Sequence, residues 1–187
     1  EDLFSPLCLP EDALSFARDF LASSGLKEGE QVLAIHPGSG SPAKNWEPKN
    51  FARLADWASD RAQVLLICGP ADDEVDEVRR AMKKVKPLVA DNLPLMPLAA
   101  VLNSATAYLG NDSGITHLAA SLAIPTVAIF GPTDPTIWGP RTANVRIIYT
   151  KISCSPCPPE MRTECPRPCL ENLRAGTVIE MLNSLLR

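Results

Sequence analysis

The chain has 187 residues, of which 45% are hydrophobic and 21% charged, and its formal net charge at pH 7 is −4. This is the composition of a globular domain with a proper core, and the acidic balance argues against a nucleic-acid binder held by a general positive field. No apolar stretch approaches the roughly 18 residues of a membrane span, and we expect no signal peptide at the start, where the sequence looks like an excised piece of a longer protein.

The apolar patterns predict strands and helices that alternate along the chain. Residues 10–25 have apolar side chains at helical spacing, acids in the first turn and Gly25 at the end, which predicts a helix. Residues 31–36 predict a short buried strand, and Pro48 begins a second helix. Further strands are predicted at 62–69, 87–91, 106–110, 125–131 and 145–150, and further helices at 72–85, 96–105, 114–123 and 176–187.

Strands that are apolar throughout, each followed by a helix, indicate a parallel sheet covered on both faces. The predicted fold class is therefore α/β, a single Rossmann-like doubly wound parallel sheet. Ligands of such sheets bind outside the carboxyl ends of the strands. The loops that follow Ile35, Cys68, Leu109 and Phe130 are rich in glycine, proline and small polar residues, as the rim of an anion site needs.

The loop HPGSGSPAKNW can hold phosphate oxygens. Gly38 and Gly40 let the backbone approach a ligand, Ser39 and Ser41 offer hydroxyls, and Lys44 supplies a mobile cation. It is neither a Walker A loop nor the dinucleotide G-x-G-x-x-G. The alternative is a flexible loop with a solvated lysine.

The segment GNDSGITH predicts a stronger anion site, because a helix begins within it. If Asp112 or Ser113 caps that helix, the N–H groups from Ser113 to Thr116 point into the crevice at the strand ends. His117 lies about one turn beyond Ser113 and could donate a proton to a phosphate oxygen. The alternative is that His117 is a satisfied interior residue.

Two other loops carry acids. Asp72 to Glu74 follow the second long strand, where a carboxylate could accept a ribose hydroxyl or simply stabilise the start of a helix. Asp134 lies among three prolines and is interpreted as a turn former rather than a base.

Three segments, HPGSGSPAKNW, GNDSGITHLAA and IPTVAIFGPTDPTIWGP, resemble the C-terminal half of glycosyltransferase family 9, the ADP-heptose:lipopolysaccharide heptosyltransferases, in the family's order and spacing. The resemblance covers nearly the whole chain from about Gln31 onward. It implies the C-terminal lobe of a two-lobed GT-B enzyme, with residues 1–30 as interdomain linker and leading helix and 31–187 as the nucleotide-sugar-binding domain. The family often has threonine where this chain has Ser113, and the hydroxyl is kept.

The resemblance also implies roles for residues. The family's phosphate-contacting positions match Ser39, Gly40, Lys44, Asp112, Gly114 and His117. Its ribose-contacting acid matches Asp73 or Glu74. Its adenine-contacting positions match Leu93, Leu95 and Met96. Lys44 and His117 would stabilise the leaving phosphate.

The same resemblance implies a reaction. The donor would be ADP-heptose, transfer would invert the anomeric centre without a required metal or cofactor, and the acceptor would be the lipid A–core. The acceptor and the catalytic base belong to an N-terminal lobe absent from this chain, so we expect the chain to bind donor but not transfer sugar. The full enzyme would work at the inner face of the inner membrane of a Gram-negative bacterium, in the cytoplasm, with peripheral membrane association.

Four of the six cysteines, Cys154, Cys157, Cys165 and Cys169, are clustered. Their spacing allows free thiols in a proline-rich loop, a zinc knuckle or stable disulfides, and we expect a reducing compartment and free thiols.

Rival functions remain open at this stage. A non-catalytic nucleotide-binding module and a GT-B transferase that uses another nucleotide sugar both fit the fold. An oxidoreductase is disfavoured because no G-x-G-x-x-G follows the first strand.

Overall fold

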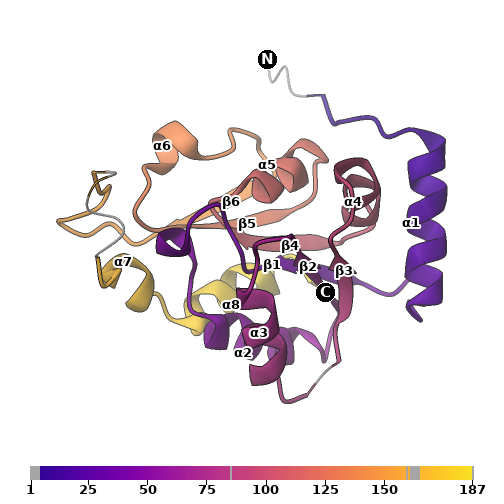
Figure 1. The fold of residues 1–187 in the computed structure, drawn as a ribbon, viewed down its shortest axis with the longest axis horizontal. Coiled ribbons are helices and arrows are strands. Elements are labelled where there is room, and N and C mark those ends of the chain that lie inside the picture. The colour runs from indigo at the N-terminus through magenta and orange to yellow at the C-terminus, as the bar shows by residue number, and fades with distance from the viewer. Residues whose placement is uncertain (1–4, 85, 159, 161–164, 187) are drawn as a thin grey trace.

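The computed structural model describes residues 5–84, 86–158, 160 and 165–186, and it contains one six-stranded sheet between two layers of helices (Figure 1). The strands are β1 (Val32–His36), β2 (Gln63–Cys68), β3 (Leu88–Asp91), β4 (Ala107–Asn111), β5 (Thr126–Phe130) and β6 (Val145–Tyr149). Their order is β3-β2-β1-β4-β5-β6 and each neighbouring pair is parallel. The predicted doubly wound parallel sheet is confirmed.

The winding of the chain reverses between β1 and β4. The first strand, β1, lies in the middle of the sheet. The chain then runs outward through β2 to β3 and crosses back to β4 on the other side of β1. The loops after β1 and β4 therefore start side by side but run to opposite faces of the sheet. Ligands of such sheets bind in the crevice between two loops of this kind.

The helices cover both faces, and the alternation of side chains along each strand supplies both cores. On one face α2 (Pro48–Ala58), α3 (Glu74–Ala81) and α8 (Ala175–Asn183) pack against Leu33 and Ile35. On the other face α1 (Glu11–Ser23), α4 (Leu95–Leu102) and α5 (Gly114–Ser121) surround Val32 and Ala34. Figure 1 shows α1 and α4 beside each other, with α2, α3 and α8 across the sheet from them.

Three short helices were interpreted from the sequence as irregular loop. They are η1 (Pro42–Lys44), α6 (Pro135–Trp138) and α7 (Pro168–Glu171), and a proline stands at the start of each. Proline lacks the N–H that a first helical turn leaves unpaired, so a proline-rich loop can begin a helix as readily as a turn. The carboxylate of Asp134 caps α6 by accepting the Thr136 N–H at 2.8 Å.

Several predicted helices are shorter in the structure. The helix predicted over 72–85 is α3, and at Met82 the backbone is already extended; residue 85 lies outside the described residues, as does 187 at the end of the predicted last helix. Gly25 has φ +87° just after α1, as its predicted place at the helix end requires. In the part of the chain that is described, no helix combines the length and hydropathy needed to cross a membrane.

Candidate functional site

Buried polar side chains gather where β1, β4 and β5 end. Buried polar groups must find hydrogen-bond partners, so such a concentration indicates a constructed network rather than ordinary core. The buried polar residues at this edge are His36, Asn45, Asn111, Asp112, Ser113, Thr116 and Thr133.

Ser113 caps α5. Its Oγ accepts the Thr116 N–H at 3.3 Å, and its own backbone is extended, as expected of an N-cap. The N–H groups of Gly114 and Ile115 precede the first intrahelical bond, from His117 N to the Ser113 carbonyl at 3.3 Å. A Cβ added to Gly114 would meet nothing within 4 Å, so the space beside this first residue of the helix is open. Of the two predicted caps, Ser113 is the one observed.

Lys44 comes from η1 and reaches the residue just before this cap. Its Nζ donates to the Asp112 carbonyl at 2.8 Å and lies 3.3 Å from Asp112 Oδ2. The hydroxyl of Thr133, from the loop after β5, donates to the same Oδ2 at 2.8 Å. The two predicted loops thus meet, and the Asp112 carboxylate balances the ammonium rather than standing ready for a ligand of its own.

His117 is an exposed residue of α5, and its side chain reaches α6. Its Nε2 is 3.0 Å from the carbonyl oxygen of Trp138. A carbonyl only accepts, so Nε2 carries the proton and Nδ1 is the nitrogen left for another partner.

The serines of the first loop bond to each other. Ser39 Oγ donates to the Ser41 carbonyl at 2.7 Å and accepts the Ser41 N–H at 3.2 Å. Gly40, between them, is exposed. The loop is therefore a closed turn that presents backbone around Gly40.

The three consecutive acids after β2 have different surroundings. Asp73 is exposed at the N-cap of α3 and makes no side-chain cap bond, whereas Glu74 Oε1 accepts the Asn45 Nδ2–H at 2.6 Å. Asp72, the first of the three, faces inward: its Oδ2 is 2.9 Å from His36 Nε2 and accepts the Gly69 N–H at 2.7 Å. The hydrogen bond with His36 lowers the pKa of the Asp72 carboxyl, and the Gly69 N–H adds to this against the opposing effect of burial.

His36 is the functional candidate that sequence reasoning missed, and Asp72 was considered there only for the ribose. His36 ends β1, is only 4% exposed, and its Nδ1 is 3.3 Å from Ser113 Oγ. A Cβ on Gly38 would come within 1.9 Å of Asp72 Oδ1, so this glycine makes room for the carboxylate over the first loop. A signal was present, because one of only two histidines stands at the carboxyl end of a buried strand.

Asn111 connects the glycine-rich loop to the end of β4. This fully buried side chain accepts the Trp46 N–H at 3.1 Å and donates from Nδ2 to the Pro37 carbonyl at 2.6 Å. The backbone on both sides of the glycine-rich loop is thereby fixed to the end of β4.

The residues predicted to contact adenine lie at the start of α4. Leu95 and Met96 are 66% and 46% exposed, and Leu93 is half-buried against the core under α4. Two large apolar side chains in water at the rim of the sheet offer a surface on which a planar base can stack, although they do not enclose it.

The cysteine cluster is outside this edge. Cys157 and Cys169 are buried, Cys157 Sγ donates to the Cys154 carbonyl at 3.0 Å, and among the described residues no three His, Cys, Asp or Glu side chains are arranged to hold a metal ion. Burial raises the pKa of the Cys169 thiol, and the nearby Cys157 and Cys165 add to this. In the described part of the chain these cysteines form no disulfide and no arrangement that would hold zinc, and the free-thiol interpretation stays a prediction.

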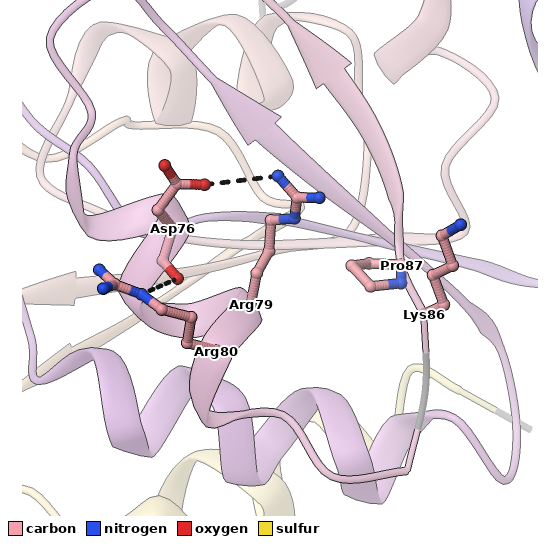
Figure 2. A pocket seen from close by; sticks show the side chains of 5 residues that line it. All are labelled: Asp76, Arg79, Arg80, Lys86 and Pro87. Carbon is pink, nitrogen blue, oxygen red and sulfur yellow. Dashed lines mark hydrogen bonds and ion pairs between the residues drawn. The ribbon is translucent and has the colours of Figure 1, made fainter.

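A different surface depression, of about 640 Å³, lies where α3 ends and the chain enters β3. Figure 2 shows its lining of Asp76, Arg79, Arg80, Lys86 and Pro87. Arg79 lies 3.4 Å from Asp76 Oδ1, and Arg80 Nε donates to the Asp76 carbonyl at 3.1 Å. Exposed pairs one turn apart on a helix contribute only about 0.2–0.5 kcal/mol, so this is a solvated charged face.

Comparison with known proteins identifies the family to which the chain belongs. Residues 5–167 match the model of glycosyltransferase family 9 (heptosyltransferase). A lipooligosaccharide heptosyltransferase 2 of Campylobacter jejuni is 31% identical over 87% of this chain and 53% of its own length. The chain thus spans about half the length of the curated relatives it matches.

Two solved structures share the fold. A glycosyl transferase family 9 protein from Veillonella parvula is 29% identical, with a TM-score of 0.85 over 96% of this chain and 53% of its own. The E. coli ADP-heptose LPS heptosyltransferase II is 25% identical, with a TM-score of 0.80 over 98% and 54% of the two chains.

Proposed function

The chain belongs to glycosyltransferase family 9, the heptosyltransferases, and we propose that it is the nucleotide-sugar-binding half of an inverting transferase whose donor is ADP-heptose. The observation that carries the proposal is the convergence of Lys44 on the start of α5, where its Nζ lies 2.8 Å from the Asp112 carbonyl. A mobile ammonium and the unpaired N–H groups at the positive end of a helix form the combination that binds a diphosphate.

The chemistry follows from where negative charge develops. When the bond between the sugar and the diphosphate breaks, charge accumulates on the leaving phosphate. Lys44 and the N–H groups of Gly114 and Ile115 meet that charge, and His117 adds a donor from Nδ1 when its imidazole is doubly protonated. To reach the phosphate, Lys44 shares its ammonium between Asp112 and the ligand.

Other parts of the site take the rest of the donor. Leu95 and Met96 receive the adenine, and Glu74, bonded to Asn45, or the free carboxylate of Asp73 receives the ribose. The ADP-heptose named for the E. coli relative fits this division. The general base and the contacts to the acceptor, the lipid A–core, belong to a second lobe. The chain alone therefore binds donor without transferring sugar. Neither donor binding nor sugar transfer requires a metal in this proposal.

A nucleotide-binding module without transfer, or a transferase for another nucleotide sugar, is the competing function. Calorimetric titration of this chain with ADP, UDP and GDP distinguishes them. We expect ADP to bind most tightly; a preference for UDP would contradict the heptosyltransferase donor, and no binding of any of the three would contradict a nucleotide site.

Lys44→Ala tests the leaving-group role. A lost charge-assisted hydrogen bond is worth about 1.5–3 kcal/mol, so ADP affinity should fall by roughly 10- to 150-fold. Lys49→Ala, which removes an exposed lysine paired with Glu47, is the control and should leave ADP affinity unchanged. In a two-lobed enzyme turnover should also fall; a normal turnover for Lys44→Ala would reject the role in the chemical step.

A further inference from the structure

His36 stands directly behind the N-cap of α5, and both of its ring nitrogens are held. Nε2 lies 2.9 Å from Asp72 Oδ2, and Nδ1 lies 3.3 Å from Ser113 Oγ. The imidazole is buried, so these two side chains rather than water determine where its protons lie.

The first proton is on Nε2. The Asp72 carboxylate can only accept, and it also accepts the Gly69 N–H at 2.7 Å. Nδ1 faces a hydroxyl, which can donate or accept. In the neutral ring, Ser113 donates its O–H to Nδ1.

A second proton fits without any heavy atom moving. If Nδ1 is protonated it donates to Ser113 Oγ, and the Ser113 O–H turns to Thr116 Oγ1, 3.2 Å away. Thr116 Oγ1 can accept because its own O–H is given to the Asn111 carbonyl at 2.5 Å. The network therefore offers both ring nitrogens a hydrogen-bond partner in the imidazole form and in the imidazolium form.

Charged groups on two sides of His36 have opposite effects on its imidazolium form. Asp72, from the loop after β2, favours the imidazolium, whereas the positive end of α5 opposes it. Lys44 and Asp112 form a pair on the other side of the cap, and they cancel in large part. Tyr108 on β4 and Cys68 at the end of β2 both keep their protons, because burial raises their pKa values, that of Cys68 to about 11. His117 is on α5, about one turn beyond Ser113, and is hydrogen-bonded to the Trp138 carbonyl.

We propose that His36 is a positioning residue of the diphosphate site, one that takes up a second proton when the diphosphate binds and acts on the ligand through Ser113 and the first turn of α5. The proposal rests on the proposed function, since a diphosphate in front of α5 removes the opposition of the helix end and leaves Asp72 to favour the imidazolium. Asp72 is the residue that keeps His36 in this orientation.

The coupling between ADP binding and proton uptake predicts the direction in which ADP affinity changes with pH. Because binding takes up a proton, ADP affinity must fall as pH rises, by about tenfold per pH unit for one full proton. Calorimetry of ADP binding at pH 7.5 in two buffers of different ionisation enthalpy gives the number of protons taken up. We expect wild type to take up a larger fraction of a proton than His36→Gln, while the ADP phosphate's own titration contributes equally to both.

Wild-type protein gives a second measurement that does not depend on the folding of a variant. In ¹⁵N NMR spectra at pH 8, free His36 should have Nε2 protonated and Nδ1 bare; saturating ADP at pH 7 should protonate both nitrogens. Binding of ADP with His36 still neutral, or with equal proton uptake in wild type and His36→Gln, would overturn this inference and leave the nucleotide site intact. No binding of ADP at all would overturn both.

Discussion

Two groups of charged and polar side chains on this molecule differ in how they are held. At the carboxyl edge of the sheet, His36 from the end of β1, Asp72 from the loop after β2 and Ser113 from the cap of α5 meet, almost entirely withdrawn from water. In the depression beside α3, Asp76 and Arg79 are three residues apart and largely exposed (Figure 2).

The difference shows what separates a constructed site from a charged surface. Bringing distant polar groups together in the interior costs desolvation and is stable only when each group finds its partner. The pair on α3 needs no such arrangement, since neighbours on one helix turn meet in any case. Substitutions should therefore have large effects in the first region and small ones in the second.

The largest loss of stability is expected for Asn111→Ala. The change leaves the Trp46 N–H and the Pro37 carbonyl buried without partners, and one such group costs about 1–3 kcal/mol. Urea denaturation should show a loss of roughly 3 kcal/mol. Asn103→Ala, at an exposed asparagine after α4, is the control; an equally small change at both positions would mean that the network is not needed for the fold.

Gly38→Ala should be the next in size. The new Cβ would overlap Asp72 Oδ1, so the carboxylate must leave His36, at a cost of about 1.5–3 kcal/mol for a charged hydrogen bond. Gly40→Ala is the matched control, because a Cβ there meets nothing within 4 Å. Thermal denaturation of both variants measures the difference, and equal melting temperatures would contradict the close packing of Asp72 on this loop.

A smaller effect follows from the depressed pKa of Asp72. A carboxyl with a lower pKa in the folded state stabilises the fold above its unfolded pKa, about 3.9, and loses that contribution as pH falls through the folded value. Between pH 6 and pH 3, wild type should therefore lose more stability than Asp72→Asn. The same loss in both proteins would show that the His36 contact does not lower this pKa.

The smallest effect is expected in the depression. Arg79→Ala removes an exposed pair and should change the free energy of unfolding by less than about 0.5 kcal/mol. A loss as large as that of Asn111→Ala would remove the distinction between the two regions.

The sequence was sufficient to predict the sheet, the loops at its carboxyl edge, the cap of α5 and the loop that carries Lys44. These features follow from local patterns: apolar runs, a serine before a helix, glycines beside a lysine. The choice of Asp72 over Asp73 and Glu74 could not be predicted in this way. It depends on which of three consecutive acids faces His36, and that is decided by the space above Gly38, a contact between loops of neighbouring strands.

The most direct test of the central claim is a titration of ¹⁵N-labelled protein with ADP, followed through the backbone amide signals. We predict the largest shifts at Gly114 and Ile115, whose N–H groups open α5, and none at Arg79 or Lys86. Shifts centred on Arg79 and Lys86, with Gly114 and Ile115 unmoved, would contradict the account.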